Sequence, residues 1–91
     1  IAFGVEVMHQ VAKLKKMEKI SIQYVWNPKT LAKGDVSNVC AVVDKFFCDV
    51  LTRAGKITDD NYTVIPTVSY EFGGIDKINP RVVAKITEIR E

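Results

Sequence analysis

The sequence predicts a small α+β (mixed α/β) domain, in which two helices pack on a small sheet in the order α-β-α-β-β. One long segment repeats its apolar residues with the period of a helix, and three other segments alternate apolar and polar residues as strands do. The 91 residues suffice for a single domain, 1–91, and 47% of them are hydrophobic while 26% are charged. This balance is that of an ordinary globular protein.

The first helix and the first strand are expected before residue 28. An apolar stripe predicts a helix over about 5–16, and its members are Val7, Met8, Val11 and Leu14. Alternation predicts a strand over 19–26, which Asn27-Pro28 ends. A loop over 30–34 follows. Trp26 is expected to pack in the core or in a dimer, with base stacking as the alternative.

The longest predicted element is a helix that follows the acidic turn at Asp35 and ends at Gly55. Its apolar positions recur at helical spacing and are Val39, Val42, Val43, Phe46, Phe47, Val50 and Leu51. A strand is then expected over 62–72, with Pro66 marking its early part as an edge or a bulge. A loop through Gly73-Gly74 leads to the last strand, over 81–89.

The two cysteines predict free thiols. Cys40 and Cys48 lie eight residues apart on the long helix, about 12 Å along its axis, which is too far for a disulfide. With His9 as the single histidine, expected at the surface, a Cys/His zinc site is not expected. Free thiols, the lack of an apolar run of about 20 residues and the lack of a signal-peptide pattern predict a cytoplasmic protein without a membrane partner.

Charge is unevenly distributed along the chain. The net charge of +2 does not by itself indicate nucleic-acid binding. However, residues 1–33 hold six Lys against two Glu, whereas residues 34–60 hold five Asp against three basic residues. A basic region beside an acidic one suits a metal site that receives a polyanion. A solvated helix face explains Lys13, Lys15 and Lys16 equally well.

A helical wheel separates the polar residues of the long helix. At about 100° per residue, Asn38, Lys45 and Asp49 share one narrow strip, whereas Asp44 falls on another flank. The wheel therefore predicts that Lys45 and Asp49 point the same way and that Asp44 does not.

Acidic residues flank the long helix at both ends, and this pattern suits a divalent-metal site. Mg²⁺ or Mn²⁺ needs few carboxylates because it keeps several waters, and Asp35 and Asp60 could supply them. With a lysine to stabilise phosphate charge, such a site suits phosphodiester hydrolysis. Alternatively, Asp35, Ser37 or Asn38 only caps the helix, and residues 59–61 only form a turn.

The polar pattern resembles a known family. Its parts are Asp35-x-x-Asn38, Lys45-x-x-x-Asp49-x-Leu51, Ala54-Gly55 and Asp59-Asp60. Together they resemble the RusA-type Holliday-junction resolvases, which are small, dimeric, metal-dependent endonucleases common in phages and prophages. The resemblance covers nearly the whole chain and implies a structure-selective endonuclease in the bacterial cytoplasm. It would resolve four-way DNA junctions, as a homodimer, by metal-dependent phosphodiester hydrolysis.

The resemblance also implies residue roles. Asp35 and Asp60 would bind Mg²⁺ or Mn²⁺ and, with Lys45, would be catalytic. Supporting positions would be Asn38, Ser37, Asp49 and Asp59, and DNA would be held by Lys13, Lys16, Lys29 and Lys33.

The chain departs from the family pattern at three points. Ser37 stands where the family has a second acid, so one carboxylate is missing. Lys45 follows Asn38 by seven residues instead of the commoner three, which moves the lysine about 6 Å along the helix. The family's N-terminal strand is not found, which predicts an N-terminally truncated domain. Two other functions therefore stay open: a non-catalytic branched-DNA binder disabled at Ser37, and a protein-interaction domain.

Overall fold

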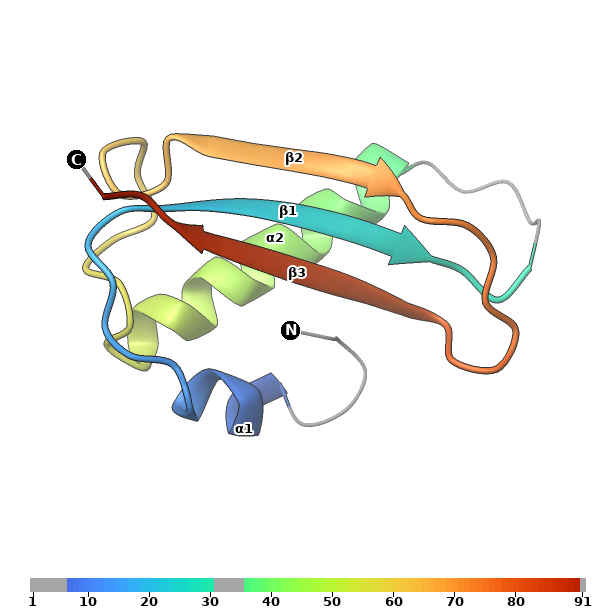
Figure 1. The fold of residues 1–91 in the computed structure, drawn as a ribbon, viewed down its shortest axis with the longest axis horizontal. Coiled ribbons are helices and arrows are strands. Elements are labelled where there is room, and N and C mark those ends of the chain that lie inside the picture. The colour runs from blue at the N-terminus through green and yellow to red at the C-terminus, as the bar shows by residue number, and fades with distance from the viewer. Residues whose placement is uncertain (1–6, 31–35, 91) are drawn as a thin grey trace.

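The computed structural model describes residues 7–30 and 36–90, and its elements follow the predicted order (Figure 1). The helices are α1, Val7–Ala12, and α2, Val36–Arg53. The strands are β1, Ile20–Asn27, β2, Thr67–Phe72, and β3, Arg81–Glu88. The predicted α+β class is confirmed.

The three strands form one mixed sheet in the order β2-β1-β3. β1 pairs in parallel with β2, from Ser21 opposite Thr67 to Trp26 opposite Phe72, and antiparallel with β3. Parallel neighbours need a long crossover connection, which α2 supplies while it covers one face of the sheet (Figure 1). Both outer strands are edges, and every residue of β2 is exposed.

The core lies between β1 and α2. Alternate residues of β1 point into it, and Ile20, Ile22 and Tyr24 are at most 1% exposed. They meet Phe47 and Leu51 of α2, which are fully buried. Cys40 and Cys48 are buried free thiols, as predicted. Trp26 is half-buried against this core and His9 is exposed, also as predicted.

α2 ends at the predicted glycine. Gly55 has a φ of +74°, a left-handed conformation that glycine adopts without strain. The Lys56 N–H donates to the Leu51 carbonyl at 2.9 Å, and the Gly55 N–H donates to the Thr52 carbonyl at 3.1 Å. These two bonds form a Schellman motif, which satisfies the last carbonyls of the helix.

Two predicted boundaries are wrong. α1 ends at Ala12 instead of near residue 16, because the N–H groups of Lys13 and Leu14 bond three residues back in tight turns. β2 begins at Thr67 instead of residue 62. Asn61 accounts for the later start, because its carbonyl accepts the N–H groups of Val64 and Ile65 and curls the chain before the strand. Most of the predicted 30–34 loop lies outside the described residues.

The buried face of α2 is rotated from the one that the apolar pattern predicts, by roughly 80° on a helical wheel. Val42 and Phe46, predicted on the core face, are 72% and 51% exposed. The half-buried Asp44 instead faces the sheet, where Tyr24 donates a hydrogen bond to it. A carboxylate is tolerated there because its hydrogen bonds replace those to water.

Candidate functional site

The face of α2 that points away from the sheet, together with the segment that follows α2, forms a hollow of about 510 Å³. Its polar lining consists of Lys45, Asp49 and Asp60, and Val42 and Phe46 supply the apolar part. Lys45 and Asp49 therefore point the same way, which confirms the common facing that the wheel predicts. The hollow joins three of the residues to which the resemblance assigns a role.

Asp60 reaches α2 because the chain reverses after Gly55. Ile57, 2% exposed, anchors the returning segment in the core. The Lys56 carbonyl accepts a hydrogen bond from the Met17 N–H at 2.7 Å, which fixes the start of that segment against the chain before β1. The position of Asp60 beside Asp49 thus follows from a structured return, in which apolar burial and a backbone bond hold the chain.

Asp59 and Asp60 have different environments. The Asp59 carboxylate accepts hydrogen bonds from the Asp60 N–H at 2.7 Å and from the Asn61 Nδ2 at 3.0 Å. Such local bonds are typical of an aspartate that stabilises a turn. The Asp60 side chain instead lines the hollow. Of the acidic pair, the geometry therefore favours Asp60 as a ligand and Asp59 as a turn residue.

Asp49 already has a partner in the structure. Its Oδ2 lies 3.2 Å from Nη2 of Arg53, one helical turn further on, and both side chains are largely exposed. Exposed ion pairs of this kind contribute little free energy and exchange readily. The Arg53 side chain therefore competes only weakly with an entering cation for the Asp49 carboxylate.

A single chain does not bring the start of α2 into this hollow. Ser37 and Asn38 are exposed in the first turn of α2, and Asn38 lies eleven residues before Asp49, about 17 Å along the axis. Asn38 thus shares the strip of Lys45 and Asp49 but not their hollow. The predicted ligand Asp35 and the predicted DNA contact Lys33 lie outside the described residues.

A buried polar network lies on the opposite flank of α2. Tyr24 Oη donates to Asp44 Oδ1 at 2.6 Å, and Cys48 Sγ lies 3.3 Å from the same oxygen. Burial, followed by the bond to Asp44, raises the pKa of Tyr24 far above its ordinary value. Burial and the nearby Asp44 charge raise the pKa of Cys48 to about 12. Both groups therefore keep their protons and remain donors to Asp44.

This network joins the central strand to α2 directly beside Lys45. With Asp44 on the inward flank, Lys45 lies on the outward, exposed face of α2. The apolar pattern misses this role of Asp44. The spacing of four residues from Asp44 to Cys48 is the one signal that places both on a common flank.

A second, basic hollow of about 400 Å³ lies where β1 begins and β3 ends. Four cationic and two acidic side chains line it, together with Ile89: Lys15, Lys16, Lys19, Arg90, Glu18 and Glu88. Arg90 Nε at 3.0 Å and Lys15 Nζ at 3.4 Å hold the pKa of the Glu88 carboxyl below its ordinary value. Of the predicted DNA contacts, Lys16 lines this hollow, whereas Lys13 and Lys29 are exposed elsewhere.

The sequence pattern gives no reason to group Arg90 with Lys15, Lys16 and Lys19. Only the antiparallel pairing of Ile20 with Glu88 brings Arg90 next to the lysines that precede β1. This cluster can therefore be predicted only when the strand order is known, and the sequence pattern does not specify that order.

The described residues offer few ligands for a metal ion. Within residues 7–30 and 36–90, no group of three or more His, Cys, Asp or Glu side chains is arranged to hold one. Asp49 and Asp60 nevertheless line one hollow, and one or two carboxylates with several waters suffice for Mg²⁺. Their oxygen donors fit Mg²⁺ or Mn²⁺ better than softer metals.

Comparisons with protein-family models, with curated proteins and with solved structures found no match to this chain. In the part of the chain that the structure describes, no helix has the length and apolar character needed to cross a bilayer.

Proposed function

We propose that this protein is a structure-selective endonuclease that cleaves four-way DNA junctions as a homodimer with Mg²⁺ or Mn²⁺. The observation that carries the proposal is the hollow in which Lys45, Asp49 and Asp60 meet. Two carboxylates and a lysine are a suitable set for phosphodiester hydrolysis, since the carboxylates hold a cation and the lysine neutralises phosphate charge. The resemblance to RusA-type resolvases assigns roles to the same three residues.

Each residue has a defined part in the proposed reaction. Asp60 and Asp35 hold the metal ion, and Asp49 supports it. When bound, the ion lowers the pKa of a coordinated water and offsets phosphate charge. Lys45 holds the phosphate that enters the hollow, beside the apolar wall of Val42 and Phe46. The basic hollow, with Lys16 and Arg90, contacts the DNA backbone where β1 begins and β3 ends, so binding weakens as salt rises.

In the proposed homodimer, the start of α2 in one chain lies close to the hollow of the other chain. Val42 and Phe46 are exposed apolar residues one turn apart on the outward face. If two copies of α2 pack antiparallel so that Val42 meets Phe46 of the partner subunit, Asn38 comes level with Val50 of the partner subunit. The first turn of each α2 then lies beside the hollow of the other chain. Asp35 of one chain and Asp60 of the other would thus share a metal ion.

The direct test is nicking of a synthetic four-way junction in Mn²⁺. We expect the parent to nick it and Asp60→Asn to lower the rate by on the order of a hundredfold, because one charged ligand is lost. Glu71→Gln is the matched control, since it removes one exposed carboxylate from β2, outside the hollow. Equal loss in both variants, or no nicking by the parent, would contradict the proposal.

A mixing experiment tests the shared site. Asp35→Asn and Asp60→Asn are each expected to nick the junction much more slowly than the parent. Mixed dimers contain one site with both aspartates intact, so mixing should restore nicking of one strand. If each chain held a complete site by itself, mixing would restore nothing, although the parent would still be active.

The exposed Ser37 favours one alternative, a branched-DNA binder without cleavage. It stands at the start of α2 where the resembling family has an acid, so the cation could lack a ligand. This alternative predicts salt-dependent junction binding by the parent without nicking in Mn²⁺. Ser37→Asp would then be expected to introduce nicking, and that gain separates a disabled nuclease from a protein that never binds metal.

A further inference from the structure

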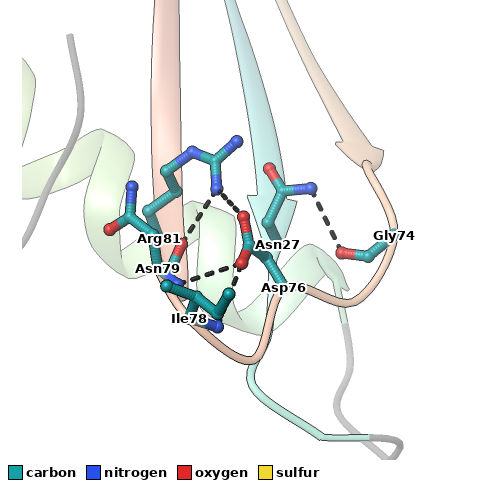
Figure 2. Close-up of polar contacts among 6 residues, drawn as sticks. All are labelled: Asn27, Gly74, Asp76, Ile78, Asn79 and Arg81. Carbon is teal, nitrogen blue, oxygen red and sulfur yellow. Dashed lines mark hydrogen bonds and ion pairs between the residues drawn. The ribbon is translucent and has the colours of Figure 1, made fainter.

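The loop between β2 and β3, residues 73–80, is held in one conformation by the Asp76 carboxylate (Figure 2). Oδ1 accepts hydrogen bonds from the N–H groups of Ile78 at 3.1 Å and Asn79 at 3.0 Å. Oδ2 lies 2.6 Å from Nη1 of Arg81, which also donates to the Asn79 carbonyl at 2.9 Å. Four bonds thus close the tip of the loop on itself.

The base of the loop is fixed to the end of β1. Asn27 Nδ2 donates to the Gly74 carbonyl at 3.1 Å, and the Asp76 N–H donates to the Pro28 carbonyl at 2.9 Å. At Gly73 the backbone packs so closely that an added Cβ would lie 2.5 Å from Val25 Cγ1. The loop is therefore anchored on the central strand as well as closed at its tip.

The charge state of Asp76 keeps this arrangement in place at neutral pH. The Asn79 N–H and the Arg81 guanidinium hold the pKa of the Asp76 carboxyl below its ordinary value. A depressed pKa means that the stabilisation is present above the ordinary aspartate pKa and is lost as the pH falls through the folded-state value. The loop is thus preformed before any partner binds.

The loop presents an apolar side chain to solvent. Ile78 is 96% exposed at its tip, although the N–H groups of Ile78 and Asn79 are both bonded to Asp76. Two exposed lysines accompany it: Lys77 precedes it, and Lys29 follows the proline whose carbonyl holds Asp76. The loop lies at the end of the sheet where β1 and β2 end and α2 begins (Figure 1).

We propose that this loop is a wedge for branched DNA, in which Ile78 inserts between bases at the branch point while Lys77 and Lys29 contact the flanking phosphates. The inference rests on the proposed function, since it names a further contact with the same substrate. A rigid loop suits this role because little conformational entropy is lost when it inserts. Base stacking is interrupted at a branch point, and this lowers the free-energy cost of inserting a side chain between bases there.

The size and charge of the tip favour DNA over a protein partner. A stable protein interface buries about 800 Å² on each side, whereas one isoleucine side chain offers roughly a fifth of that. A single apolar side chain is sufficient for a wedge that unstacks one base step. With Asp76 paired to Arg81, the charges left at the tip are the two lysines, which match phosphates on both sides of a step.

The test uses a four-way junction with 2-aminopurine at the branch point, bound in Ca²⁺ to prevent cleavage. Insertion unstacks the probe, so we expect the parent to raise its fluorescence severalfold. Ile78→Ser should remove most of this increase, whereas Ile78→Leu should keep it. Lys77→Gln should lower the slope of binding against salt by about one and leave the probe signal at saturation unchanged.

The outcomes separate the wedge from the proposed function. If the parent binds and nicks junctions while Ile78→Ser gives the full fluorescence increase, the wedge is overturned and the nuclease stands. If the parent does not bind junctions at all, both are overturned. Far-UV circular dichroism of Ile78→Ser, expected to match the parent because the side chain is exposed, excludes misfolding as the cause of a lost signal.

Discussion

Asp44 and Phe47 lie on the face of α2 that packs against the sheet, whereas their neighbours Lys45 and Phe46 lie on the face that points away from it. Each of these two pairs thus consists of one aromatic residue and one charged residue. On the inward face, Phe47 is fully buried and makes an edge contact with Tyr24, with ring centroids 6.3 Å apart. On the outward face, Phe46 is 51% exposed and borders the hollow of Asp49 and Asp60.

The buried face of α2 combines apolar side chains with one hydrogen-bonded carboxylate, so the apolar pattern alone does not identify it. The outward face carries Val42 and Phe46, whereas the inward face carries Phe47, Leu51 and the Asp44 carboxylate that accepts a hydrogen bond from Tyr24. Val42 and Phe46 on the outward face are the apolar residues that the proposed homodimer covers. The inward face supplies stability and orientation, and the outward face carries the candidate chemistry.

The largest expected contrast concerns the two phenylalanines. Phe47→Ala should lower the free energy of unfolding by about 3–5 kcal/mol, because it leaves a cavity in the core. Phe46→Ala should cost less than about 1 kcal/mol in urea unfolding at low protein concentration, since the ring is half in solvent. Equal costs would mean that α2 rotates in solution.

A thiol on the inward flank of α2 should react much more slowly than a thiol introduced on the outward face. With its pKa raised to about 12, Cys48 has almost no thiolate at pH 8, and we expect it to react with a disulfide reagent on the order of a thousandfold more slowly than in urea. The measurement uses the Cys40→Ser background. For comparison, Lys45→Cys in a background without Cys40 and Cys48 should react at an ordinary rate. A fast Cys48 would place the inward flank in solvent.

The Tyr24–Asp44 bond should be worth less than the core ring but more than any outward ion pair. In a double-mutant cycle of Tyr24→Phe and Asp44→Ala, each change should cost about 1–3 kcal/mol, with a coupling of about 1 kcal/mol. The exposed Asp49–Arg53 pair should give a coupling below about 0.5 kcal/mol. Similar couplings for the two pairs would remove the distinction between the faces.

Much of the fold follows from local signals in the sequence. Gly55 and Asn27-Pro28 place the ends of α2 and β1, because backbone conformation at these residues depends on few neighbours. The facing of Lys45 and Asp49 follows from helical geometry alone. The late start of β2 was not predictable from alternation, since the turn at Asn61 competes with the strand through local hydrogen bonds.

The rest depends on contacts between distant residues. The rotation of α2 accompanies a contact between Tyr24 and Asp44, twenty residues apart, and the basic hollow requires β3 to pair with β1. The sequence also groups Asn38 with Lys45 and Asp49, whereas the length of α2 keeps Asn38 out of their hollow. The proposed function therefore places the two ends of the site on two chains of a homodimer.

Mn²⁺ binding, followed by electron paramagnetic resonance of the free ion, tests the central claim most directly, because it does not depend on finding the right DNA. The outward hollow predicts that the parent binds Mn²⁺, that Asp60→Asn weakens this affinity at least about tenfold, and that Glu71→Gln leaves it unchanged. Indistinguishable binding by the parent and Asp60→Asn, or no binding by the parent, would contradict a metal site in this hollow.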